Sequence, residues 1–192
     1  MSAHIAWPDV KYNAPVLIVP ENGVEDILDP EYISVLLKAS EIDVLGFMLD
    51  ADTKPASRYG RIRTACQSAF PDLPAEIPAG GLVAENAVKK RLGVWVMPDN
   101  KTEGCLETFL HELVPDESAP VWVHAGEAMT RAQELGAKWR ASHEPKVRLY
   151  TWLAWQEPPG QSPGRALTQK ILDPHSTSAH SFVAWFRGLY QL

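Results

Sequence analysis

Two carboxylates one residue apart stand at the end of an apolar run. Residues 44–49 are apolar apart from one glycine, which predicts a buried β-strand, and Asp50 and Asp52 follow directly. In an open parallel sheet, ligands bind beyond the carboxyl ends of the strands. Both carboxylates could reach one divalent cation there, and oxygen ligands favour Mg²⁺ or Mn²⁺. The alternative is structural: Asp50 caps the next helix and Asp52 is a solvated turn residue.

A basic stretch follows this acidic pair. Residues 54–63 include Lys54, Arg58, Arg61 and Arg63 and contain no acidic residue. Apolar residues at helical spacing between positions 57 and 70 predict that the stretch lies on a helix. Beside a bound cation, Lys54, Arg58 and Arg61 would hold the oxygens of a phosphate-bearing substrate. The alternative is a solvated helix face that balances acids elsewhere.

Further acids follow another apolar run, at residues 92–97. If this run is a parallel strand beside the first, Asp99 lies at the same sheet edge as Asp50. Glu103 and Glu107 are four residues apart in a predicted helix, so we expect them to share one helix face. Asp99 and Glu107 are therefore the candidates to complete or extend the metal site.

The apolar patterns alternate between strand and helix along the first part of the chain. A strand is predicted at 15–19, then a helical stretch at 24–39 that Pro30 interrupts, then the elements described above. After Pro120 four helical stretches are expected, at 121–142, 146–155, 164–172 and 177–190. This order predicts an α/β fold, with a mainly parallel sheet flanked by helices in residues 1–117. Residues 118–192 are expected to form an all-helical C-terminal extension packed on it.

Composition and charge exclude several classes of protein. The chain has 192 residues, 45% of them apolar and 22% charged, which is typical of a folded soluble protein and not of a disordered one. A net charge of −6 argues against a nonspecific nucleic-acid coat protein. No apolar run is long enough to span a membrane, and residues 1–8 lack the features of a secretory signal. With Cys66 and Cys105 interpreted as reduced core thiols, we expect a cytoplasmic protein without membrane association.

Taken together, these segments resemble one known family. Its members contain, in the same order, segments similar to residues 22–28, 44–53, 92–100, 104–110 and 151–160. The chain resembles the bacterial Toprim-like family of uncharacterised proteins over about residues 16 to 190. That family is distantly similar to the Toprim domains of primases, topoisomerases and overcoming-lysogenization-defect nucleases. The resemblance implies a four-stranded parallel sheet with a divalent-metal site. Asp50 and Asp52 match its acidic pair, and Asp99 and Glu107 match acidic positions of the subfamily.

The chain departs from the Toprim pattern at its start. Toprim domains open with a strand that ends in Glu-Gly-x-x-Asp, and the Glu is the expected general acid/base or metal partner. Residues 18–28 resemble the second strand and helix of the family, so we expect the first strand–helix unit to be missing. The loss would leave a sheet edge that a partner or the helical extension must cover.

Two glutamates could stand in for the missing one. Glu25 and Asp29 have the spacing of the motif, but Glu25 follows a turn instead of a strand, and we discount it. Glu21 follows the apolar run at 15–19 directly, although its spacing to the next aspartate is one residue too long. We therefore take Glu21 as a catalytic candidate beside Asp50 and Asp52.

Two classes of function are consistent with these residues. The first is a nuclease-like, metal-dependent phosphoryl-transfer domain that acts on nucleic acid, with phage defence as the setting that the resemblance implies. The second is a catalytically incomplete binding or regulatory subunit that docks a partner ATPase or forms a homodimer. Metal-dependent cleavage by the pure protein would distinguish them, and so would an opening Toprim strand encoded upstream of Met1.

Overall fold

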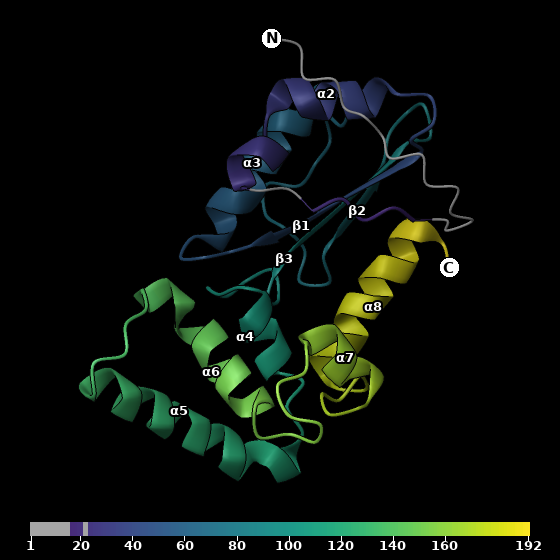
Figure 1. Ribbon diagram of the computed structural model, residues 1–192. Coiled ribbons are helices and arrows are strands. Elements are labelled where there is room, and N and C mark those ends of the chain that lie inside the picture. The colour runs from purple at the N-terminus through teal and green to yellow at the C-terminus, as the bar shows by residue number, and fades with distance from the viewer. Residues whose placement is uncertain (1–15, 21–22) are drawn as a thin grey trace.

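The computed structural model describes residues 16–20 and 23–192 (Figure 1). The strands are β1 (Val44–Asp50), β2 (Leu82–Glu85) and β3 (Arg91–Met97). The helices of the first half are α1 (Val24–Ile27), α2 (Pro30–Lys38), α3 (Pro55–Cys66) and α4 (Leu106–His111). Those of the second half are α5 (Ala119–Glu134), α6 (Glu144–Leu153), α7 (Pro163–Thr168) and α8 (Thr177–Tyr190), with short 3₁₀ turns η1 (Asp116–Ser118) and η2 (Ala141–His143).

The sheet is mixed and its strand order is β1-β3-β2. β1 pairs in parallel with β3, so that Asp50 lies opposite Met97, whereas β2 pairs antiparallel with β3. The expectation of a mainly parallel sheet is therefore wrong for the described residues, as is the implied number of four strands. Strand β2 escaped prediction because it is only four residues long. A tight turn joins β2 to β3, and so short a connection can link only antiparallel strands.

The apolar run at 15–19 does not form the predicted buried strand over its described part. Residues 16–20 have no regular structure, and Leu17, Ile18 and Val19 are all more than half exposed. An apolar, β-branched run favours a strand only where a neighbouring strand supplies hydrogen bonds and a face to cover. Pro15 lies outside the described residues.

The helical stretch at 24–39 is interrupted at Pro30, as predicted. Helix α1 ends before Asp29, and Pro30 is the first residue of α2. The Asp29 carboxylate accepts a hydrogen bond from the Glu31 amide at 2.8 Å, which caps the new helix. Proline is tolerated at this first position because its missing N–H would have no partner within the helix.

Helices cover both faces of the sheet, as predicted. Leu92, Val94 and Val96 pack on the side of α3, and Trp95 and Met97 pack on the opposite side. This alternation follows from the period of two along a strand. Figure 1 shows α2 and α3 on one side of the sheet and α8 on the other.

The C-terminal part of the chain is helical, as predicted, and it shares a core with the sheet. The predicted stretches at 121–142 and 164–172 are too long, because α5 ends at Glu134 and α7 at Thr168. Trp95 of β3 belongs to the same buried cluster as Leu149 and Trp152 of α6 and Leu189 of α8. The boundary at residue 117 stays a prediction. Within the described ranges, none of the helices combines the length and apolar character that a membrane crossing needs.

Gly93 permits α8 to lie close to the sheet. A Cβ atom at this position would lie 2.3 Å from Cδ2 and 2.8 Å from Cδ1 of the fully buried Leu189. We expect Gly93→Ala to lower the free energy of unfolding by about 1–3 kcal/mol, the usual cost of overpacking a core. Urea titration followed by circular dichroism measures it.

Gly188 provides the matched control, because it lies in the same helix as Leu189 and a Cβ atom added to it would meet nothing within 4 Å. Gly188→Ala should leave stability unchanged or raise it by up to about 1 kcal/mol, through helix propensity. Equal effects of the two substitutions would show that α8 does not pack on Gly93.

Candidate functional site at the carboxyl end of β1

Asp50 is the last residue of β1 and its side chain reaches the start of α4. Its Oδ1 accepts a hydrogen bond from the Leu106 amide at 2.9 Å, and Leu106 is the first residue of that helix. A carboxylate is stabilised at this place because the first turn of a helix presents unpaired N–H groups. The structural alternative considered for Asp50 thus holds in one respect: the residue caps a helix, although this helix is α4 and not the adjacent α3.

The surroundings of Asp50 nevertheless disfavour its charge. Partial loss of hydration raises the pKa of Asp50 above its usual range, and the nearby carboxylates of Glu107 and Asp52 raise it further. The Leu106 amide and the Arg58 guanidinium act in the opposite direction without reversing the shift. Like charges gathered near one point, beside a loop, are a common feature of ligand and catalytic sites.

Asp52 links the loop after β1 to the segment that precedes α4 through backbone hydrogen bonds. Its backbone N–H donates to the Gly104 carbonyl and its carbonyl accepts from the Gly104 N–H, both at 2.8 Å. Its φ of 52° lies in the left-handed region, which aspartate tolerates better than most residues. The carboxylate is exposed and forms an ion pair with Arg58 of α3.

Arg61 also has an acidic partner. Its two Nη atoms each lie 2.7 Å from an oxygen of Glu25, the bidentate geometry that suits arginine. The hydrogen bonds from Arg61 lower the pKa of Glu25. Glu25, discounted on its sequence context, therefore lies beside the basic helix. Of the cations assigned to phosphate, Arg58 and Arg61 are paired with acids, while no ion pair involves Lys54 among residues 16–20 and 23–192.

Asp99 follows β3 at the same edge of the sheet, but its carboxylate is hydrogen-bonded within the turn that follows the strand. Oδ1 accepts hydrogen bonds from the Lys101 amide at 3.0 Å and from the amide and hydroxyl of Thr102 at 2.7 and 3.0 Å. Partial burial alone would raise the pKa of Asp99, but these hydrogen bonds lower it overall. No hydrogen bond joins Asp99 to Asp50 in the described part of the chain.

The buried side chain of Asn100 stabilises this turn. This role of Asn100 was not predicted from the sequence. The side chain is only 3% exposed, its Oδ1 accepts from the Val96 amide at 2.8 Å, and its Nδ2 donates to the Ala79 carbonyl at 3.2 Å. The Pro-Asp-Asn sequence after a strand signals such a turn, because asparagine accepts the left-handed backbone that the turn needs. Asn100 has a φ of 68°.

Glu107 lies in the first turn of α4, next to the amide that Asp50 caps. Its side chain is 18% exposed, and its Oε1 is 3.9 Å from Nζ of Lys146 in α6. Glu103 precedes the start of the helix, so the expectation that it shares a helix face with Glu107 is wrong. The helix starts later because Cys105, in an extended conformation, forms the N-cap with Thr108.

Cys105 is thus half-buried at a helix start, and the expectation of a core thiol is wrong for it. It is correct for Cys66, which is fully buried. Loss of hydration raises the pKa of Cys66 to about 12, so the thiol is unreactive at neutral pH.

A groove of about 340 Å³ opens beside Glu107, between α4 and the start of α6. It is lined by Glu107, Thr108, His111, Ala141, Glu144, Pro145 and Arg148. Sequence reasoning did not connect these residues, because the two helices that contribute them are separated by all of α5.

The carboxylates do not form a ready-made metal cage. Among the described residues, no three His, Cys, Asp or Glu side chains come close enough together to hold a metal ion. Glu21, the remaining catalytic candidate, lies outside the described residues. The arrangement brings Asp50, Asp52 and Glu107 to one edge and keeps Asp99 in its own turn.

Comparison with known proteins places the chain in a family. The model of the family described as "Protein of unknown function (DUF3226)" matches residues 1–191. The chain belongs to this family. No curated protein and no solved structure matches it. Because the match runs through both the sheet and the C-terminal helices, a DUF3226 protein includes both parts.

Proposed function

We propose that this DUF3226 protein binds Mg²⁺ or Mn²⁺ at the carboxyl end of β1 and uses it for nuclease-like phosphoryl transfer on nucleic acid. The observation that carries the proposal is the environment of Asp50. Its carboxylate is fixed by the Leu106 amide, while partial loss of hydration, and then the carboxylates of Glu107 and Asp52, raise its pKa. A cation held by Asp50 and Glu107 would relieve the repulsion between them. The resemblance of Asp50 and Asp52 to the Toprim acidic pair supports the same conclusion.

The donor set fits a cation that keeps part of its water shell. Mg²⁺ in proteins is commonly held by one or two carboxylates, several waters and the phosphate of the substrate, and not by a complete protein cage. Asp50 uses one oxygen for the Leu106 amide, which leaves the other for a metal ion. Glu107 would be the second ligand, and Asp52 could join after release from Arg58. Asp99 would first have to give up the hydrogen bonds of its turn.

The basic side chains near the proposed metal site would bind the substrate. A bound metal ion would stabilise negative charge on the phosphoryl oxygens and activate a water molecule. When a phosphate approaches, Arg58 would exchange its bond to Asp52 for one to a phosphate oxygen, and Lys54 would add a second contact. Arg61 could do so only by leaving Glu25. Glu21 remains the proposed general acid or base.

An oligonucleotide cleavage assay tests the proposal. Single-stranded and duplex DNA and RNA are incubated with the protein in Mg²⁺, in Mn²⁺ or in EDTA. We expect cleavage only with a metal ion, and a rate at least about 100-fold lower for Asp50→Asn, because a metal ligand is lost. Glu117→Gln, which removes an exposed acid from η1, is the control and should retain full activity. Cleavage in EDTA, or full activity of Asp50→Asn, would contradict the proposal.

A second candidate is a binding domain that does not cleave. It is favoured by the pairing of Arg58 and Arg61 with acids, which leaves little free positive charge on α3 for a substrate. The partner would be an ATPase or a second copy of the chain. Metal binding at Asp50 without cleavage of any oligonucleotide would favour this function over the first.

A further inference from the structure

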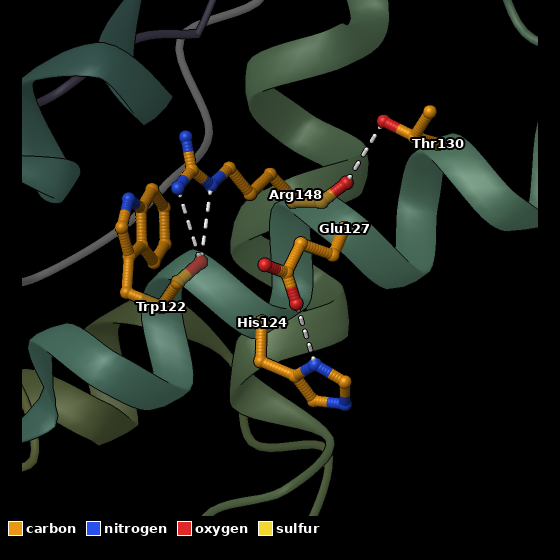
Figure 2. A network of polar contacts seen from close by, with 6 residues as sticks. Trp122, His124, Glu127, Thr130 and Arg148 are labelled. Carbon is orange, nitrogen blue, oxygen red and sulfur yellow. Dashed lines mark hydrogen bonds and ion pairs between the residues drawn. The ribbon is translucent and has the colours of Figure 1, made fainter.

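The α4–α6 groove beside Glu107 contains an arginine that is fixed in place but has no acidic partner. Nε and Nη2 of Arg148 both donate to the Trp122 carbonyl, at 3.2 and 3.1 Å, and the guanidinium carbon lies 4.7 Å from the centre of the Trp122 ring. Figure 2 shows the guanidinium beside the indole, with the His124–Glu127 pair farther along α5. Within the described ranges, no carboxylate forms an ion pair with Arg148, in contrast to Arg58, Arg61 and Arg131.

An arginine held in this way is preorganised to bind an anion. The two bonds to the Trp122 carbonyl leave Nη1 without a hydrogen bond among the described residues. A guanidinium that is held over an aromatic ring and bonded to a carbonyl loses little freedom when it binds a phosphate oxygen. The groove that Arg148 lines is open to solvent and contains further polar groups, from Thr108 and His111.

An aromatic surface lies in the same groove. The His111 ring stacks on Trp122 with centroids 4.5 Å apart and planes inclined by 10°. His111 is exposed while Trp122 is buried, so the histidine carries the surface that a ligand can reach. Planar rings and guanidinium groups in this arrangement are the platforms on which nucleobases stack. Glu144, also in the lining, could accept hydrogen bonds from the amino group of a base.

The geometry points to the α4–α6 groove as the subsite for one nucleotide of the substrate, with its phosphate on Arg148 and its base on His111. The inference rests on the proposed function for one point, the position of this nucleotide relative to the scissile phosphate. Because Glu107 belongs both to the acidic edge and to the groove, the two would be neighbours. The volume of about 340 Å³ suits a single nucleotide and not a duplex, since small-ligand sites occupy roughly 300–1,000 Å³.

Calorimetric titration of AMP into the full chain in EDTA tests the subsite apart from the metal site. Adenosine and inorganic phosphate are titrated in parallel. We expect AMP to bind more tightly than either, and Arg148→Lys to weaken AMP binding about tenfold, because lysine keeps the charge but loses the planar fork. His111→Gln should weaken it about threefold through loss of stacking.

The chain offers close controls for both substitutions. Arg131→Gln removes an arginine of α5 that is paired with Glu134, and His124→Gln removes a histidine that is stacked on Trp155 outside the groove. Both should bind AMP as the parent does. The inference is overturned if AMP does not bind, if only phosphate binds, or if Arg148→Lys and His111→Gln bind AMP like the parent. AMP binding that depends on Arg148, in a protein that shows no metal binding at Asp50, would retain the nucleotide subsite and reject the proposed phosphoryl transfer.

Discussion

Asp50→Asn is expected to lower the affinity for Mn²⁺ by at least about 100-fold, since a ligand is lost, without lowering the free energy of unfolding. An asparagine Oδ1 can still accept the hydrogen bond from the Leu106 amide, so the cap on α4 is kept. The like-charge repulsion from Glu107 and Asp52 disappears. Because the Asp50 side chain stays partly exposed to solvent, we expect a gain of only about 0.5 kcal/mol at pH 7. Calorimetric Mn²⁺ titration and urea unfolding measure the two effects.

The stability difference between Asp50→Asn and the parent depends on pH. The raised pKa means that the folded protein holds a proton on Asp50 more tightly than the unfolded chain does. The corresponding contribution to stability is fully present below the usual pKa of aspartate and is lost as the pH rises through the raised value. The advantage of Asp50→Asn over the parent should therefore grow with pH across that window and stay constant above it.

Asp50→Ala distinguishes the contribution of the helix cap to stability from that of the negative charge. Alanine removes the repulsion as asparagine does, but it leaves the Leu106 amide without its acceptor. We expect the alanine variant to be about 1 kcal/mol less stable than the asparagine variant, the usual value of a helix cap. If asparagine destabilises the protein as much as alanine, Asp50 is a structural carboxylate, and its charge does not destabilise the folded protein.

Trp185→Ala is expected to lower the free energy of unfolding by about 3–5 kcal/mol, the range for a buried aromatic residue. The side chain is 4% exposed, and its Nε1 donates to the Leu82 carbonyl of β2 at 2.9 Å. Its ring centroid lies 5.6 Å from that of Trp95 in β3. The substitution removes a contact of α8 with both β2 and β3, so the sheet and the C-terminal helices should unfold together at a lower urea concentration.

Trp155→Ala is the matched control for this loss. Trp155 is 46% exposed and stacks on His124, with centroids 5.4 Å apart. Its removal should cost less than about 1 kcal/mol, as is usual for partly exposed positions. If both variants lose the same stability, the C-terminal helices do not share a core with the sheet.

Periodicity was sufficient to predict the elements with strong apolar patterns. β1 and β3 are short apolar runs, and α8 has one apolar face along its whole length, so their existence follows from the sequence alone. The position of Asp50 at a strand end was predictable for the same reason. The exposed run at 16–19 has the same local pattern as these strands, and only the absence of a pairing strand in the described sheet distinguishes it.

The features that sequence reasoning missed depend on contacts between distant segments. The link from Asp50 to the start of α4 joins residues 56 positions apart, and the pair of Arg61 with Glu25 joins residues 36 positions apart. No local pattern signals such a pair, because long charged side chains reach many partners. The α4–α6 groove depends on how α6 packs against α4, which is set by buried side chains and not by the residues that line it.

Paramagnetic broadening by Mn²⁺ is the most direct test of a metal site at Asp50, because it locates a bound cation without a substitution. Mn²⁺ is added in less than equimolar amount to the ¹⁵N-labelled protein, and amide signals are recorded before and after. If Mn²⁺ binds at the carboxyl end of β1, the signals of Asp50, Asp52, Leu106 and Glu107 should broaden first and recover when excess Mg²⁺ is added. Sharp signals at these positions, with broadening elsewhere or nowhere, would contradict a metal site at the carboxyl end of β1.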